Sequence, residues 1–277
     1  MTGVLTLVAT PIGNLGDLPP RAVEAFQTAD LVCCEDTRRT GSLLKHLGVH
    51  VAELRRLDDH TEYDAIPQIL DRLRSGEQVV LVSDAGTPGI SDPGERLVAA
   101  AVDAGLTVTS VPGPVAAIAA LVASGLPSGR FVFEGFLARK GQERSAQLAA
   151  IAAETRTTVF YESPNRLAAT LAALAEVCGG SRRAVVAREL TKLHEELRRG
   201  SLVELAEWAG TGVKGEVVVV VAGAEAPAEL DDDALLERLR GLLADGSSRR
   251  DAIDRVAAET GVRRGRVYDL ALALDAP

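Results

Sequence analysis

The chain has 277 residues, of which 47 % are apolar and only 3 % aromatic, and its formal net charge is −9. A chain of this length and composition can bury a substantial core, which excludes an intrinsically disordered protein. The excess of acidic residues argues against a protein that coats naked nucleic acid through its overall field, because such proteins carry a large positive charge.

Cysteine use and hydropathy limit the cellular context. The three cysteines, Cys33, Cys34 and Cys178, give neither a disulfide framework nor a metal-ligand spacing. The first residues lack the basic region and the long apolar run of a signal peptide, and the apolar segment 116–126 is too short to cross a bilayer. We therefore expect a cytoplasmic protein with no membrane partner and no bound metal.

Strands and helices alternate through the first part of the chain. Asp17 is expected to cap the first helix, and the two prolines that follow it suit the first helical turn. The order of elements predicts an α/β fold with a mostly parallel sheet that helices cover on both faces. The expected strands are 4–10, 31–36, 78–84 and 107–114. The expected helices after the first are 41–48, 65–76 and 94–105.

A second α/β domain with a mixed sheet is expected after the apolar helix at 116–126. Its strands are predicted at 130–137, 157–163, 183–190 and 216–223. The composition of residues 224–233 is typical of a linker. We therefore expect an N-terminal α/β domain at 1–113, a C-terminal α/β domain at 114–224 and a helical extension at 230–277.

The extension contains three short helical patterns, at 233–243, 249–259 and 263–274. Ala257, Gly261 and Val267 have the spacing of a helix-turn-helix, in which a glycine makes the tight turn. A small three-helix cap used for packing or dimerisation fits the same pattern equally well.

Three loops at the predicted carboxyl ends of strands are rich in Gly and Pro, at 10–17, 84–94 and 112–114. Ligands of open α/β sheets bind at such ends. None of these loops has the dinucleotide or nucleoside triphosphate pattern, and none contains Lys or Arg. A polyphosphate would meet Asp84 and Asp92, whereas a cofactor with positive charge, such as S-adenosylmethionine, would be favoured. The alternative is that Gly and Pro merely form turns.

Several segments of the chain resemble the tetrapyrrole-methylase superfamily, and most closely the branch of it that methylates ribosomal RNA. The most specific are "EDTRRTG" (35–41) and "SDAGTPGISDPG" (83–94). The likeness runs in order through residues 4–223, and the tail resembles a helical extension of that branch. The other matching segments are ATPIGNLGD, VPGPVAAIAALVASGLP, FEGFLARK, FYESPNRL, ARELTKLHEE and KGEVVVVV.

The resemblance implies two α/β domains of tetrapyrrole-methylase type, with S-adenosylmethionine in the cleft between them, and a homodimer. It also implies methylation of a cytidine 2′-hydroxyl in 16S rRNA, in the decoding region of the small ribosomal subunit. Asn165 and Ala138 depart from the family pattern, in which His and Pro are common. The cofactor-binding residues it implies are Pro11, Gly13, Asp84, Ala85, Gly86, Thr87, Pro112, Ser124, Gly125, Leu126, Tyr161, Glu162 and Gly215.

A ribose hydroxyl is a poor acid, so a group that accepts its proton would help the reaction. Glu35 and Asp36 end a strand on the ligand side and are the candidate catalytic residues. The alternative is that Asp36 is a helix cap that precedes a surface arginine pair. His60 is either an RNA contact or part of an exposed helix start. The expected RNA-binding residues are Arg38, Arg39, His60, Arg139, Lys140 and Lys192.

Two other functions compete with this interpretation. An enzyme on the same scaffold could methylate a tetrapyrrole precursor or a modified amino acid, and would not need the C-terminal helices. A non-catalytic nucleic-acid-binding regulator could instead use Arg263, Arg264 and Arg266 for recognition, but this leaves the Gly-rich loops unexplained. Because aromatics are few and the total charge is acidic, we expect a folded ribosomal particle rather than naked RNA as substrate.

Overall fold

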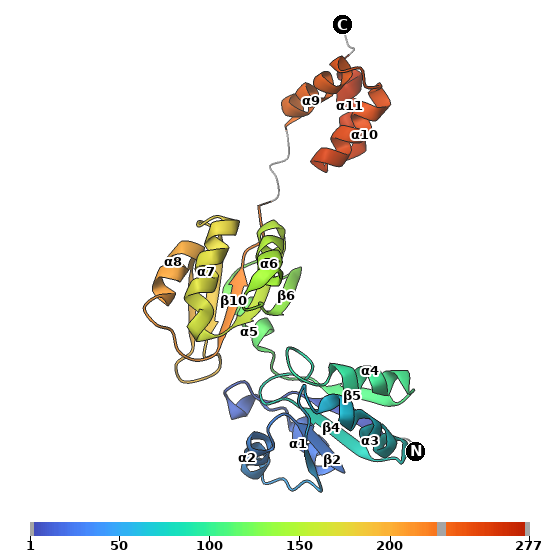
Figure 1. Ribbon diagram of the computed structural model, residues 1–277, viewed down its shortest axis with the longest axis vertical. Coiled ribbons are helices and arrows are strands. Elements are labelled where there is room, and N and C mark those ends of the chain that lie inside the picture. The colour runs from blue at the N-terminus through green and yellow to red at the C-terminus, as the bar shows by residue number, and fades with distance from the viewer. Residues whose placement is uncertain (1–2, 226–230, 275–277) are drawn as a thin grey trace. The chain divides into compact units, whose positions relative to one another are not determined.

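The computed structural model describes residues 3–225 and 231–274 (Figure 1). The chain divides into two compact units, with the division between Ala224 and Glu225. The first unit contains two five-stranded sheets, and the second contains three helices. Among the described helices, none has both the length and the apolar character needed to cross a membrane.

The first sheet is parallel throughout, with the strand order β3-β2-β4-β1-β5. Its central strands are almost continuous runs of Val, Leu and Cys, as expected for strands that are buried on both faces. The strands are β1 (Val4–Val8), β2 (Leu31–Cys34), β3 (Leu54–Arg56), β4 (Gln78–Val82) and β5 (Thr107–Val111).

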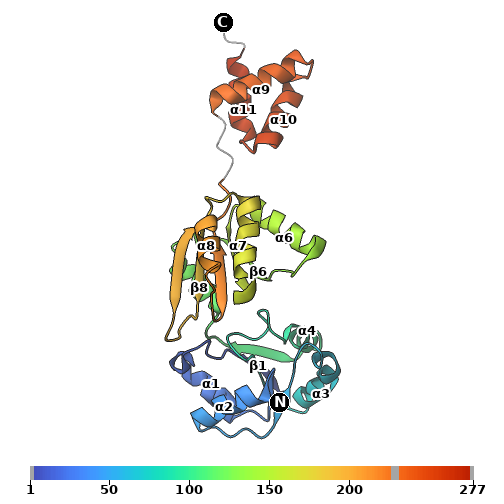
Figure 2. The same cartoon turned by 60° about the vertical axis from the view of Figure 1, so that its left-hand side comes forward.

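Helices cover both faces of this sheet, which confirms the predicted fold class. Phe26 and Leu44 of the first two helices lie in one core cluster, and Ile69 and Leu97 of the next two lie in another. Figures 1 and 2 show α1 and α2 on one side of the sheet and α3 and α4 on the other. The helices are α1 (Pro20–Gln27), α2 (Thr37–Leu47), α3 (Glu62–Arg74) and α4 (Glu95–Asp103).

Two local features differ from the sequence prediction. Asp17 was expected to cap α1, and this is wrong, because Asp17 ends a 3₁₀ turn (Leu15–Asp17) and the N-cap of α1 is Pro19. Proline at the first helical position already has the φ of a helix, so α1 starts at Pro20 without a side-chain cap. The short strand β3 was not predicted.

The second sheet is mixed, with the order β6-β7-β10-β8-β9. Strands β6 and β7 are parallel, and the other neighbours are antiparallel. Strand β9 was not predicted from its sequence, ELRRGS, which lacks an apolar face. The strands are β6 (Phe131–Phe136), β7 (Thr157–Glu162), β8 (Arg183–Arg188), β9 (Glu196–Ser201) and β10 (Val217–Val221).

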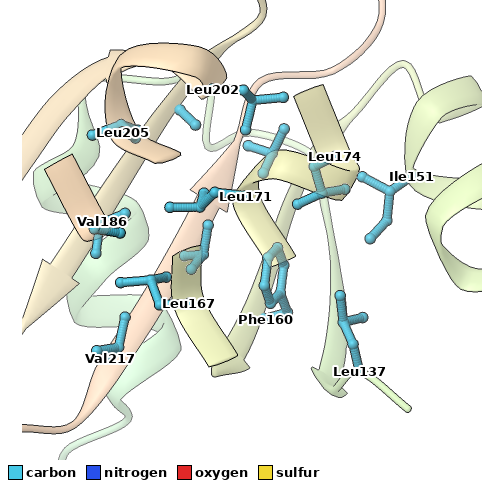
Figure 3. Packing of buried hydrophobic residues seen from close by; sticks show 14 of the residues in the cluster. Leu137, Ile151, Phe160, Leu167, Leu171, Leu174, Val186, Leu202, Leu205 and Val217 are labelled. Carbon is cyan, nitrogen blue, oxygen red and sulfur yellow. The ribbon is translucent and has the colours of Figure 1, made fainter. Parts of the chain in front are cut away.

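Three helices cover one face of the second sheet, and one helix covers the other. Leu167, Leu171 and Leu174 of α7 pack with Phe160 of β7 and Leu205 of α8 (Figure 3). On the opposite face, α5 contributes Ala117, Ala120 and Leu121 to a separate cluster. The helices are α5 (Ala116–Ser124), α6 (Gly141–Ala153), α7 (Pro164–Cys178) and α8 (Leu202–Ala209).

The second unit is a three-helix bundle with its own core. Its helices are α9 (Asp232–Ala244), α10 (Arg249–Thr260) and α11 (Arg264–Ala273). Gly261 caps α10 at φ +69°, a conformation that glycine adopts without strain, and so makes the turn into α11. Val267 is fully buried, and Ala257 packs against the same core. The helix-turn-helix spacing therefore corresponds to a real turn between two packed helices.

Candidate active site

Three loops at the carboxyl edge of the first sheet are bonded to one another. The backbones of Thr10 and Gly86 exchange two hydrogen bonds, with N···O distances of 2.9 and 3.0 Å. The Thr87 hydroxyl donates to the carbonyl of Pro114 at 3.1 Å. The loops after β1, β4 and β5 thus form one rigid surface, as the predicted positions of their strands require.

Buried hydroxyls and small residues hold this surface in place. The Thr10 hydroxyl donates to the Ser83 carbonyl, and the Ser83 hydroxyl donates to the Gly86 carbonyl, both at 3.1 Å. Gly86 has φ +88°, which an L side chain rarely adopts. A Cβ at Gly113 would lie 2.8 Å from that of Ala9, so only glycine allows this approach of the loop to β1.

A cleft of about 380 Å³ lies against this surface and is lined by loops that follow strands of the first sheet and by strands and loops of the second. Its volume falls in the range of roughly 300–1,000 Å³ that is usual for small-molecule sites. Three of the lining side chains are carboxylates, Asp92, Glu162 and Glu216, and no Lys, Arg or His is among the residues that line it. The other lining residues are Ile12, Ala85, Gly86, Thr87, Ile90, Ser91, Val115, Ala116, Phe136, Tyr161, Ser163, Pro164, Leu190, Gly215, Val217 and Val218.

Glu162 is a buried carboxylate, and each of its two oxygens accepts a hydrogen bond. One oxygen accepts from the Ser163 backbone N–H at 2.8 Å and lies 3.3 Å from Nε of Arg166. The other accepts from the Thr170 hydroxyl at 2.7 Å. These contacts fix the end of β7 where it meets the cleft.

Tyr161 provides the aromatic wall of the cleft. Its ring centroid lies 5.1 Å from that of Phe133, in an edge-on arrangement, and 5.4 Å from that of Phe136, in a tilted one. The Ala117 N–H, at the start of α5, donates to its hydroxyl at 3.4 Å. Burial, with a smaller contribution from the charge of Asp92, raises the pKa of Tyr161.

The loop after β8 closes one side of the cleft and is strained. Glu189 and Thr191 have φ of +50° and +65°, which non-glycine residues rarely adopt. The ammonium of Lys192 donates to Glu189 at 2.9 Å and to Glu216 at 2.8 Å. A Cβ at Gly13 would lie 2.5 Å from Cγ of Lys192, so the first loop also requires glycine here.

The predicted cofactor-binding residues fall into three groups. Six of them line the cleft: Ala85, Gly86, Thr87, Tyr161, Glu162 and Gly215. Four belong to the same loops but do not line it: Pro11, Gly13, Asp84 and Pro112. The structure does not bring the remaining three, Ser124, Gly125 and Leu126, to the cleft.

These last three residues form the C-terminal end of α5. Gly125 is its left-handed C-cap, and the Ser124 hydroxyl accepts from the Leu126 N–H at 3.0 Å. Ser124 and Leu126 line a separate cavity of about 260 Å³ with Arg183 and Arg199. The Arg199 side chain donates to the carbonyl of Ser124 at 3.0 Å and so satisfies the end of the helix.

The two catalytic candidates do not line the cleft either. Asp36 is the N-cap of α2 and accepts from the Arg38 backbone N–H at 2.8 Å. Its bonds to Arg38 lower the pKa of Asp36 to about 2, so it is a poor proton acceptor. Burial, followed by the charges of Asp84 and Asp59, raises the pKa of Glu35.

The predicted RNA-binding residues lie on several surfaces. Arg38 is almost fully exposed, and Arg39 lies 3.5 Å from Asp84. His60 is exposed and donates its backbone N–H to the carboxylate of Asp58, as a residue at a helix start does. Lys192 is tied to two glutamates beside the cleft, whereas Arg139 and Lys140 are exposed at the start of α6.

From the sequence, Asp92 was expected only as an acid of the loop 84–94 that disfavours a polyphosphate, and Glu216 was given no role. Asp92 is half-buried, and burial together with the charge of Glu35 raises its pKa to about 6. Its position in the same Gly-rich loop as Ala85–Thr87 was a usable signal. Glu216 lies beside Gly215, but no sequence pattern indicates that Lys192 would pair with it. In the part of the chain that the structure describes, no cluster of three or more His, Cys, Asp or Glu could hold a metal ion.

The fold of the first unit is also found in solved structures. A solved structure of uroporphyrin III C-methyltransferase from Thermus thermophilus, complexed with S-adenyl homocysteine, matches with a TM-score of 0.55 at 18 % identity. The match covers 79 % of this chain and 97 % of that one. At this identity the likeness shows the fold alone.

The sequence comparison then gives the family. The model of the Tetrapyrrole (Corrin/Porphyrin) Methylases matches residues 4–206, and the chain belongs to this family. A relative from Synechocystis, called ribosomal RNA small subunit methyltransferase I, is 47 % identical over 99 % of both chains. A protein of the same name from Mycobacterium tuberculosis is 50 % identical over 98 % of this chain and 95 % of its own.

Proposed function

We propose that this protein is an S-adenosylmethionine-dependent methyltransferase that acts on the RNA of the small ribosomal subunit. The observation that carries the proposal is a cleft lined by three carboxylates and by no cationic side chain, in a chain about half identical to relatives named for this activity. The finer assignment is methylation of the 2′-hydroxyl of a cytidine in 16S rRNA, in the decoding region.

The residues of the cleft fit S-adenosylmethionine. Bound there, the cofactor would supply a methyl group on a positively charged sulfur. The turn at Ala85–Thr87 offers backbone groups, and Gly215 lets Glu189 pack against the wall of the cleft, because a Cβ there would lie 2.4 Å from the Glu189 side chain. Apolar residues such as Leu190 and Val218 suit a flat base, and the carboxylates favour positive charge in a partly dry site.

The protein contributes mainly position and electrostatics to this reaction. A rigid surface made from three bonded loops holds both reactants in line, and such positioning is worth several kcal/mol. The same acidic cleft repels a phosphate backbone, so only the target nucleoside would enter it. Arg38, Arg39, Arg139 and Lys140, which lie outside the cleft, would contact the flanking phosphates.

The assembly of the enzyme on its substrate extends this proposal. Residues 3–113 and 114–224 would act as two domains that share the cofactor, in the cytoplasm. The protein would be a homodimer, because α5 leaves Ile118 and Val122 exposed in an apolar segment. The helix-turn-helix of the second unit would bind ribosomal RNA, which favours an assembled particle over naked RNA.

Labelled S-adenosylmethionine tests the proposal directly. The protein is incubated with small subunits from a bacterium that lacks this modification, and the labelled nucleotide is mapped. Methylation of one cytidine ribose in 16S rRNA is expected, with little label in a short oligonucleotide of the same sequence. The proposal fails if the subunit stays unlabelled, or if calorimetry detects tight ATP binding and no binding of S-adenosylmethionine.

Neither competing function has equal support. A methylase of tetrapyrroles or amino acids would share the fold, but the relatives at 47 % and 50 % identity match over the C-terminal helices as well. A regulator without catalysis would have no use for an acidic cleft formed by both sheets.

A further inference from the structure

The cleft carboxylates differ in how well they are neutralised. Glu162 has three partners, including Arg166, and Glu216 accepts from Lys192. Asp92 pairs with no Lys or Arg in the ranges that the structure covers, although it lines the same cleft. It is therefore the carboxylate there that is not held by a cation and can accept a proton.

The backbone next to Asp92 is strained. Ser91 has φ +58°, a left-handed conformation that non-glycine residues rarely adopt. Strand β6 has a bulge between Phe133 and Phe136. At this bulge, a Cβ on Gly135 would lie 3.2 Å from Oγ of Ser91. The loop of the first sheet thus rests on the bulge of the second, with Ser91 and Asp92 both at the cleft wall.

The groups that face Asp92 come from several elements, and most of them are acidic. Glu35 follows β2, Asp84 follows β4, and Asp59 precedes α3; all three raise its pKa, in addition to burial. The Ser83 side chain has the opposite effect, because its hydrogen bond lowers the pKa of Asp92. Tyr161 of β7 also faces it, since the charge of Asp92 acts on the pKa of Tyr161. A pKa of about 6 suits a base that works near neutral pH.

We infer that Asp92 is the catalytic base that accepts the proton of the ribose hydroxyl during methyl transfer. The inference rests on the proposed function. The hydroxyl oxygen forms its bond to the methyl carbon, and the electron pair of the broken carbon–sulfur bond stays on sulfur, which becomes a neutral thioether. The hydroxyl proton passes to the carboxylate, giving a neutral acid that later loses it to water. Charge and atoms balance without a metal or a further reactant.

Single-turnover methylation of small subunits by Asp92→Asn tests this inference, because asparagine keeps the shape and removes the basicity. The plateau rate is expected to fall by about 10²–10⁴-fold, and Asp92→Glu should recover part of it. For the unaltered protein the rate should rise with pH and level off above about 6, whereas Asp92→Asn should lack this rise. Asp64→Asn, an exposed carboxylate on α3, is the matched control and should leave the rate unchanged.

Two measurements without turnover separate the base from other uses of this carboxylate. Calorimetric affinity for S-adenosylmethionine should fall by no more than about tenfold in Asp92→Asn, much less than the rate, because Glu162 and Glu216 still line the cleft. Glu35→Gln should shift the titration of Asp92, followed by NMR, to lower pH, because the charge of Glu35 raises its pKa.

Three results would overturn the inference. They are a plateau rate that Asp92→Asn barely changes, a loss of cofactor affinity as large as the loss of rate, or a pH profile that persists in Asp92→Asn. If the unaltered protein itself fails to methylate small subunits while it binds S-adenosylmethionine, the proposed substrate is wrong, which is a different outcome.

Discussion

Asp92→Asn should make the free protein more stable at neutral pH. The folded state raises the pKa of Asp92 from 3.8 to about 6, so it binds the proton more tightly than the unfolded chain does. Protonated Asp92 therefore contributes favourably to the stability of the fold. This contribution is complete below pH 4, and it is lost as the pH rises through 6. Above pH 6 the ionised carboxylate therefore destabilises the fold, and asparagine removes this penalty.

The size of the effect follows from the shift. Two pKa units correspond to about 3 kcal/mol, but the side chain is half-exposed, and screening by water reduces this to about 1 kcal/mol. For a unit of this size, 1 kcal/mol moves the melting temperature by about 2–4 °C. Such a gain in stability at the cost of activity is usual for functional residues.

Urea unfolding at pH 7.5 and at pH 4 measures the difference. The free energy of unfolding of Asp92→Asn should be higher than that of the unaltered protein at pH 7.5 and equal to it at pH 4. The control Asp64→Asn, in the first turn of α3, should be neutral or slightly destabilising, because an acid favours a helix start. The reasoning is refuted if Asp92→Asn is no more stable than the unaltered protein at pH 7.5, or if it is still more stable at pH 4.

Changes elsewhere test the cleft, the core and the C-terminal helices. Gly215→Ala should weaken binding of S-adenosylmethionine at least about tenfold in calorimetry, because its Cβ would overlap Glu189 and φ is +94°; unchanged affinity would contradict this. Leu171→Ala should cost about 2–5 kcal/mol in urea unfolding, since Leu171 is fully buried. A chain that ends at Ala224 should keep its cofactor affinity but methylate small subunits at least about tenfold more slowly; full activity would mean that the C-terminal helices do not hold RNA.

The buried strands were predictable because their physics is local. Strand β10 is a run of five valines, and β4 is nearly as apolar, so each reads as a strand that is covered on both faces. Strand β9 was missed because it lies at the edge of its sheet, where polar residues such as Arg198 and Arg199 are tolerated. Its pairing with β8 depends on the tertiary fold and leaves no pattern in the sequence.

Part of the candidate site was also predictable, namely the loops that follow parallel strands. Loops that follow parallel strands must meet at one edge, so Ala85–Thr87 could be placed from sequence. Which end of α5 faces the cleft could not, and the structure places Ala116 there and Ser124 at the opposite end. Likewise, Glu35 and Asp92 both follow strands of the first sheet, but only Asp92 lines the cleft. The sequence pattern does not distinguish these two carboxylates, because the distinction depends on the three-dimensional fold.

The acidity of the cleft has a consequence for substrate choice. Carboxylates that favour a sulfonium also repel the phosphates on either side of a target nucleotide, and at close range this repulsion is only partly screened by salt. We therefore expect the binding energy for RNA to come from cationic residues that do not line the cleft, such as Arg139 and Lys140, and from the C-terminal helices. A flexible oligonucleotide could not meet these surfaces and insert one base without a large loss of entropy. A folded ribosomal particle holds the nucleotide in place beforehand, so we expect the protein to bind free RNA poorly and to methylate the assembled subunit.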